Sequence, residues 1–200
     1  MIREHVVLRA LTISAALFNF FGNFIGTLYV LYIVREVHAA PLVIGFLVGA
    51  GGISAFVGAS IAQRVIRRIG PGLAIGAMLF LYGVTGLLIP LAHDPPVVAV
   101  TLLFISQLFG DVFVSIYLIA EVSLRQAIIP NAFLGRVNAS MQFVIQGIGP
   151  VAAILAGILG TTLGLRLTIF IGVLGVIFAG SWLLISPVRR VRSFEQSSFS

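Results

Sequence analysis

Six apolar runs divide the chain, and each is long enough to cross a lipid bilayer. They span residues 11–34, 42–62, 72–92, 97–121, 138–160 and 166–186. About 20 apolar residues in a helix cross the hydrocarbon core. The chain is 60% hydrophobic and only 9% charged, against roughly 25% charged residues in soluble domains. The sequence therefore predicts an all-α, polytopic membrane protein: one six-helix transmembrane domain (residues 1–187), then an Arg- and Ser-rich tail (188–200) that we expect to be solvated.

Arginine is unevenly distributed over the gaps between these runs. All 12 strongly basic residues are arginine. With the N-terminus in the cytoplasm, ten fall on the cytoplasmic side and only Arg35 and Arg166 on the outer side. The ten are Arg3, Arg9, Arg64, Arg67, Arg68, Arg125, Arg136, Arg189, Arg190 and Arg192. Because short basic loops stay in the cytoplasm, the pattern predicts a multi-pass protein of the cell inner membrane with both termini cytoplasmic. The net charge of +6 thus indicates orientation, and we expect no nucleic-acid partner.

Several enzyme and cofactor classes are excluded by residue types that the chain lacks. It has no cysteine, and its histidines (His5, His38 and His93) lie outside the apolar runs without ligand spacing, so we expect no metal and no cofactor. Without lysine there is no P-loop. Gly110-Asp111 resembles half of the Gly-x-Gly-Asp motif of intramembrane aspartyl proteases, but no second aspartate lies in an apolar run to complete a dyad. We therefore expect no enzymatic activity.

An acid, Asp111, lies near the middle of the fourth apolar run. A charge inside the bilayer costs roughly 2.5 kcal/mol or more, and such residues usually face a cavity or a partner. Gln107 lies four residues before Asp111 and Ser115 four residues after it, so all three share one face of a helix. We predict that this face lines a pathway for protons or substrate.

Two other apolar runs carry amide pairs with the same spacing. Asn19 and Asn23 lie in the first run, and Gln142 and Gln146 lie in the fifth. If the first, fourth and fifth helices share an interior face, these amides join the acid in one polar pocket. The alternative is that they only hold helices together by hydrogen bonds, each worth about 0.6 kcal/mol.

The six runs repeat one order of residue types. The first and fourth carry the polar pairs, the second and fifth are rich in glycine, and the third and sixth have no amide or acid near the middle. Because the second set of three enters the membrane from the opposite side, the order predicts a 3+3 inverted repeat.

The fifth run contains a candidate helix bend. Gly147, Gly149 and Pro150 follow directly after Gln146. Proline inside a helix removes a backbone hydrogen bond and bends or breaks the helix. The bend is either a hinge for movement or a static kink that fits the packing.

Two gaps resemble motifs of the major facilitator superfamily. Residues 59–68 read ASIAQRVIRR, a degenerate form of the superfamily motif Gly-x-x-x-Asp-Arg-x-Gly-Arg-Arg that keeps its three basic positions. Residues 125–140 read RQAIIPNAFLGRVNAS and are similar to a segment before the eleventh helix in the branch that includes the enterobactin and macrolide exporters. The chain thus resembles the C-terminal six-helix half of such a transporter, over residues 8–187.

This resemblance implies proton-coupled efflux of a small molecule by alternating access, with the third and sixth helices facing lipid. Asp111 would carry the proton, and the amides would bind the substrate. The five cytoplasmic arginines that the motifs contain would be gate residues or simple anchors: Arg64, Arg67, Arg68, Arg125 and Arg136. Glu121 would pair with Arg125, contributing only tenths of a kcal/mol if exposed.

A complete superfamily member has about twelve helices, so the resemblance also implies a second six-helix unit. We expect this unit to be a second copy of the chain in a homodimer or a separate N-terminal half. The alternative is a truncated or non-transporting membrane protein without activity of its own.

Overall fold

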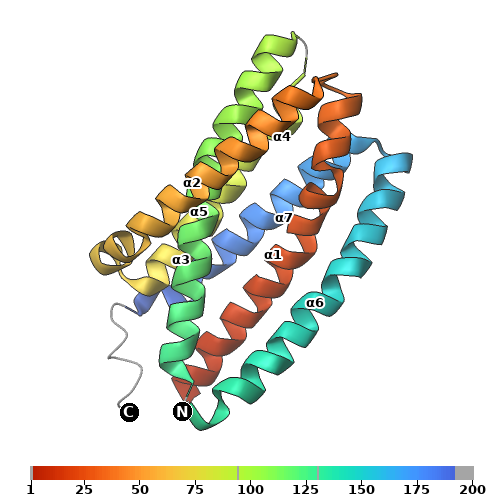
Figure 1. Ribbon diagram of the computed structural model, residues 1–200. Helices are drawn as coiled ribbons and strands as arrows, with labels where there is room; N and C mark the ends of the chain where they lie inside the picture. Colours follow the sequence, from red (N-terminus) through yellow and green to blue (C-terminus); the bar gives the residue numbers. More distant parts are fainter. Residues whose placement is uncertain (1, 94, 130, 192–200) are drawn as a thin grey trace.

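The structure is a computed structural model that describes residues 2–93, 95–129 and 131–191. Side chains at 2–5, 131–134, 136–138, 140, 141, 144–146 and 190 lie outside that description. The described chain forms seven α-helices and one short 3-10 helix (Figure 1). They are α1 (Ile2–Arg35), α2 (Pro41–Ile69), α3 (Pro71–Gly86), α4 (Leu88–Leu91), α5 (Pro96–Ile128), α6 (Asn131–Thr162), α7 (Leu165–Ile185) and η1 (Pro187–Arg190).

Nearly all residues of the predicted apolar runs lie in helices, and α3 and α4 together cover most of the third run. Five helical stretches of the described chain are long and apolar enough to cross a membrane: Val6–Arg35, Pro41–Ile69, Pro71–Leu91, Pro96–Ile128 and Leu165–Ile185. The described part of α6 adds a shorter apolar stretch, Gly147–Thr162. The all-helical membrane fold is therefore confirmed.

The helices extend beyond the apolar runs, and most of the gap between the fourth and fifth runs, residues 122–137, is helical. α5 continues to Ile128 and α6 begins at Asn131. Hydropathy marks where a helix leaves the hydrocarbon and not where its hydrogen bonds end. The end of α5 is set by proline instead, because the residue before a proline is disfavoured in the helical conformation. Accordingly Ile129, which precedes Pro130, is extended with φ −89° and ψ 123°.

The helices pack in two groups that α3 and α7 join. α5 packs against α2 and α3, whereas α1 packs against α6 and α7. α3 and α7 pack against each other in the middle, and α1 makes few direct contacts with α5 (Figure 1). The most apolar windows of the α3–α4 stretch and of α7 are 44% and 50% buried, compared with 22% to 28% for the other three candidate spans. The α3–α4 stretch and α7 are thus the most buried of the five candidate spans within this six-helix unit, and the expectation that the third and sixth helices face lipid stays a prediction.

Glycine allows the close contact between α3 and α7. A Cβ atom on Gly180 of α7 would lie 2.5 Å from the backbone nitrogen of Phe80 in α3. On the facing helix, a Cβ atom on Gly83 would lie 2.9 Å from the backbone nitrogen of Ile177. Each helix thus presents a glycine to the backbone of the other, which brings the two backbones together without an intervening side chain.

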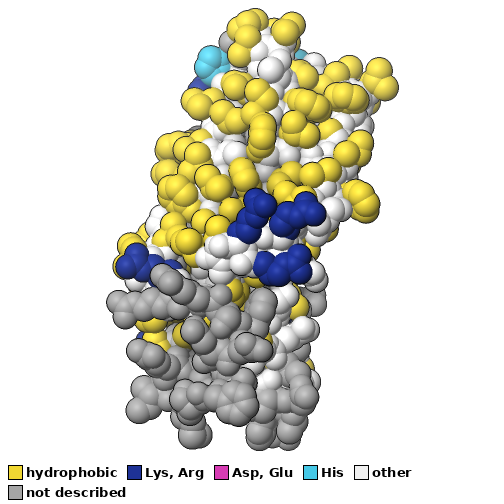
Figure 2. All heavy atoms as spheres, turned by 90° about the vertical axis from the view of Figure 1, so that its left-hand side faces the viewer, with side chains coloured by type: hydrophobic (Ala, Val, Ile, Leu, Met, Phe, Trp, Pro, Cys, Tyr) yellow, Lys and Arg dark blue, Asp and Glu magenta, His cyan; other side chains and the backbone are white. Residues whose placement is uncertain are grey.

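The two ends of the bundle differ in charge. At one end of the bundle α1 begins, α2 and α5 end, and η1 packs on α3. Gly72 N of α3 donates a hydrogen bond of 3.2 Å to the carbonyl oxygen of Val191, the residue after η1. This arginine-rich end carries the exposed side chains of Arg9, Arg64, Arg67, Arg68 and Arg189, and Figure 2 shows basic side chains gathered beneath a broad hydrophobic surface. The opposite end carries Arg35 and Arg166, both exposed. The predicted segregation of arginine is confirmed for the described residues, and the cytoplasmic assignment of the arginine-rich end stays a prediction.

Candidate functional site

A chain of three hydrogen-bonded side chains links α1 to α5. The Tyr29 hydroxyl donates to Gln107 Oε1 at 2.9 Å, and Gln107 Nε2 donates to Asp111 Oδ2. All three side chains are half-buried. Gln107 and Asp111, which are four residues apart, thus lie on one face of the helix as predicted, and they form a hydrogen bond there.

Tyr29 was not identified from the sequence. It lies in the first apolar run, six residues after Asn23. A tyrosine in an apolar helix is itself a signal, because a buried phenolic hydroxyl usually finds a hydrogen-bond partner. Which partner it finds depends on how α1 and α5 are placed, and the sequence does not show that.

Gly51 of α2 makes room for the Gln107–Asp111 pair. A Cβ atom on this buried glycine would lie 2.5 Å from both Asp111 Oδ2 and Gln107 Nε2. Two turns further, a Cβ atom on Gly58 would lie 2.7 Å from Val112 O of α5. The glycine-rich second run therefore permits close approach at these two positions, and one of them adjoins the acid.

The hydrogen-bonded chain borders a cavity with a volume of about 470 Å³ between α1, α2, α3 and α5. Its polar lining residues are Tyr29, Tyr82, Ser106, Gln107 and Asp111. Much of the remaining wall is glycine, at positions 22, 26, 51, 52, 86 and 110. Cavities of about 300 to 1,000 Å³ hold drug-sized ligands. The volume and the few polar groups thus fit a small-molecule site.

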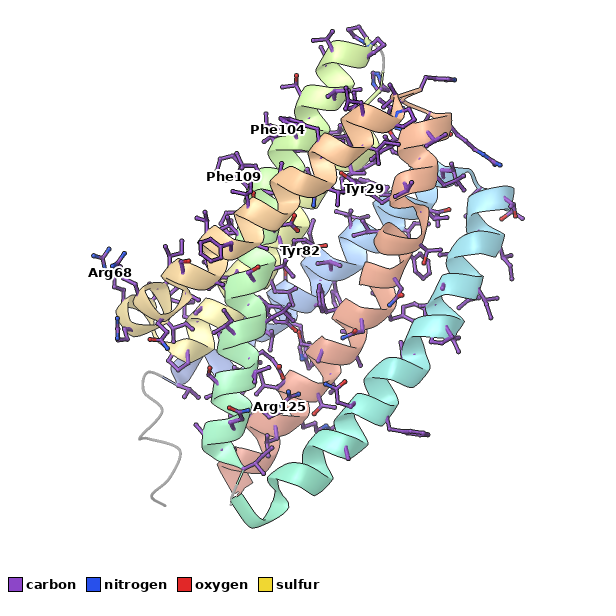
Figure 3. The ribbon with its side chains drawn as sticks, viewed as in Figure 1. Tyr29, Arg68, Tyr82, Phe104, Phe109 and Arg125 are labelled. Carbon is purple, nitrogen blue, oxygen red and sulfur yellow. The ribbon has the colours of Figure 1, made fainter. Side chains whose placement is uncertain are left out.

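Aromatic rings support the α3 side of this cavity. Tyr82 packs edge-to-face on Phe18 of α1, with ring centroids 6.0 Å apart, and Phe18 packs in the same way on Tyr117 of α5 at 5.1 Å. This row of rings connects three helices beside the cavity. Figure 3 labels Tyr29 and Tyr82, which come from α1 and α3.

The asparagines of α1 are not among the residues that line this cavity. Asn19 Nδ2 donates to Ala15 O at 2.8 Å, and Asn23 Nδ2 donates to Asn19 O at 2.7 Å, both within α1. Asn23 also lies near Gly149 of α6, where a Cβ atom would be 3.8 Å from Asn23 Nδ2. The structure therefore places Asn23 beside α6 and does not gather either asparagine with Asp111.

The predicted site residues of α6 are only partly described. Gln142 is exposed, and the side chain of Gln146 lies outside the described residues. α6 is helical on both sides of Pro150, so proline does not break the helix, and the predicted bend stays a prediction. A Cβ atom on Gly147 would have no neighbour within 4 Å, whereas Gly149 faces α1.

The predicted gate arginines have two different environments. Arg64, Arg67 and Arg68 are exposed in the last turns of α2, and Arg68 points away from the bundle in Figure 3. Arg125 instead is buried, with its Nη1 atom 3.3 Å from Glu121 Oε1, and both side chains are 8% exposed. The side chain of Arg136 lies outside the described residues.

The predicted pairing of Glu121 with Arg125 is therefore confirmed. The small contribution of tenths of a kcal/mol applied to an exposed pair, however, and this pair is buried. Glu121 ends the fourth apolar run and Arg125 lies one turn further along α5. Removing one member of a buried ion pair leaves an uncompensated charge, which costs about 3 to 5 kcal/mol.

We accordingly expect Glu121→Gln to lower the stability of the purified protein by about 3 kcal/mol, because Arg125 would lose a buried counter-charge. Thermal unfolding followed by helical circular dichroism measures this loss. The matched control is Arg64→Gln at the same end of the bundle, where an exposed charge should contribute less than about 1 kcal/mol. Equal effects of the two changes would contradict a structural role for the pair.

One comparison with known proteins identifies a family. A family model described as the Major Facilitator Superfamily matches residues 11–198. No curated protein and no solved structure matches the chain.

Proposed function

The chain belongs to the major facilitator superfamily, a family of membrane transporters, and from this premise we propose that it exports a small molecule by proton-coupled alternating access. The observation that carries the proposal is the position of Asp111, an acid that borders a cavity between four helices. Such an acid needs either a proton or a cation beside it, because a bare charge within the bilayer costs roughly 2.5 kcal/mol or more.

In this mechanism Asp111 takes up a proton when the cavity is open to one side of the membrane and releases it to the other. The hydrogen bond from Gln107 holds the carboxyl in place, and the Tyr29 hydroxyl holds Gln107 in turn. Because Tyr29 belongs to α1 and its partners belong to α5, movement of α1 relative to α5 breaks the chain of hydrogen bonds. The state of the carboxyl is thereby coupled to helix position.

The substrate path has a second polar side on α1 and α6. It holds Asn19, Asn23, Gln142 and Gln146, and the α6 segment around Gly147, Gly149 and Pro150 bends as the path opens. These residues take part in a different stage of transport from the cavity beside Asp111, since Asn19 and Asn23 are bonded within α1 in the present arrangement.

The six-helix unit works with a second such unit, either another copy of the chain or a separate N-terminal half. The arginine-rich end faces the cytoplasm, where Arg64, Arg67 and Arg68 anchor the end of α2 or contact the second unit. The exposure of these three arginines supports the anchoring or contact role, because exposed basic side chains can meet anionic lipid or an acidic partner surface. Cysteine crosslinking in intact membranes identifies the second unit.

Proteoliposomes with an imposed proton gradient test the function. They are loaded with a pH-sensitive dye and exposed to a panel of cationic, neutral and anionic fluorescent compounds. We expect at least one compound to move against its gradient while protons move in the opposite direction. The absence of any proton-linked movement across the whole panel, with correctly folded protein, would contradict the proposal.

A further inference from the structure

The cavity beside Asp111 has an unbalanced charge. Asp111 is the single charged residue among those that line it in the described part of the chain. The arginines described above lie at the two ends of the bundle or, like Arg125, are paired elsewhere on α5. An occupant that carries one positive charge would balance the carboxylate, whereas an anion would meet an uncompensated negative charge in a low-dielectric site.

The direction of the hydrogen bonds favours the same kind of occupant. Tyr29 donates to Gln107 and Gln107 donates to Asp111, so each of these donors is directed along the chain toward the carboxylate. The oxygen of the Tyr29 hydroxyl and the second carboxylate oxygen of Asp111 keep lone pairs that can accept hydrogen bonds. The Tyr29 oxygen and the Asp111 carboxylate therefore offer acceptors to a ligand, which suits an ammonium group.

The walls of the cavity suit an apolar body around that charge. Tyr29 and Tyr82 contribute aromatic rings, and tyrosine rings attract cations that approach their faces. The glycines, the uncharged Ser106 and the apolar residues Ile25, Val48, Ala55 and Ile89 add no charge to the wall. The combination of one acid, two tyrosines and an apolar wall is selective for both charge and hydrophobicity.

We propose that this cavity binds a small organic cation, an amine or quaternary ammonium compound with an aromatic or aliphatic body. Its charge lies against Asp111 and its body lies against the Tyr29 and Tyr82 rings. As a statement about substrate, this assignment rests on the proposed transport function, whereas binding itself does not require transport. The cation is thus the substrate class that the exporter would take.

Equilibrium binding to the purified full chain in nanodiscs tests this assignment. The probe is tritiated tetraphenylphosphonium, and the competitors are benzyltrimethylammonium and its neutral carbon isostere, neopentylbenzene. Because the competitors share shape and differ in charge, we expect the cation to displace the probe at a concentration at least about tenfold lower. Asp111→Asn should weaken probe binding at least about tenfold, since the side chain keeps its size and loses its charge.

A pair of glycine variants on α2 tests the geometry without removing the acid. Gly51→Ala places a methyl carbon 2.5 Å from both Asp111 Oδ2 and Gln107 Nε2, so these flexible ends must move. We expect about fivefold weaker probe binding from the lost hydrogen-bond geometry. Gly49→Ala is the matched control, because this exposed glycine has no neighbour within 4 Å of an added Cβ atom and does not line the cavity.

The outcomes separate the binding site from the transport function. Equal competition by the two isosteres, or unchanged probe affinity in Asp111→Asn, would overturn the cation site. Proton-linked movement of only neutral or anionic compounds, with no probe binding, would overturn the substrate class and leave the transport function standing. Asp111-dependent probe binding without any transport would support the site and contradict the transport function.

Discussion

Asp111→Asn is expected to reduce proton-coupled transport to the rate of protein-free liposomes while leaving the protein folded. Asparagine has nearly the shape of aspartate and can still accept the hydrogen bond from Gln107 through its Oδ1 atom. It cannot take up or release a proton near neutral pH. Among the described residues that line the cavity no other carboxyl is present to replace it.

The measurement is substrate-dependent acidification or alkalinisation in proteoliposomes that hold wild-type or variant protein at matched density. Gel filtration and helical circular dichroism serve as controls for folding. Asp111→Glu provides a second comparison, because it keeps a titratable carboxyl and should retain part of the proton movement. Wild-type rates in Asp111→Asn would show that the proton pathway runs elsewhere.

Gly180→Leu is expected to impair folding strongly, with a loss of stability of about 3 kcal/mol or more. A Cβ atom at this position would lie 2.5 Å from Phe80 N and 2.7 Å from Phe80 Cα, both of them backbone atoms of α3. A side-chain rotation cannot relieve such a contact. α3 and α7 would have to separate along the line where the two halves of the bundle are joined.

Gly49→Leu is the matched control for this change. Both variants replace glycine by leucine in a helix. Gly49, however, is exposed on α2, and an added Cβ atom there would have no neighbour within 4 Å. Yield of monodisperse protein and thermal unfolding distinguish the two variants. If both behave like the wild type, the close packing of α3 on α7 does not hold the bundle together.

The sequence predicted those features that depend on one helix at a time. Apolar length predicted which stretches form helices long enough to cross a membrane, and a spacing of four residues predicted that Gln107 and Asp111 meet. The pairing of Glu121 with Arg125 followed from the same rule. In each of these cases the geometry of a single α-helix is sufficient, and no knowledge of neighbouring helices is needed.

Features that depend on helix rotation and neighbours could not be predicted in this way. Successive residues of a helix differ by about 100° in direction, so Gly22 lines the cavity while Asn23 next to it lies near α6. The partnership of Tyr29 with Gln107 likewise depends on where α1 lies relative to α5. The burial of Glu121 and Arg125 depends on how the end of α5 is covered, since the spacing itself is the same for an exposed pair.

The central claim is that this chain couples the movement of a small molecule to the movement of protons through Asp111. The most direct test is an exchange experiment on wild-type proteoliposomes: an outward substrate gradient is imposed in the absence of a pH gradient, and internal pH is recorded. The account predicts that substrate leaving the liposomes drives protons inward, and that Asp111→Asn abolishes this signal. Substrate movement without any change in internal pH would contradict it.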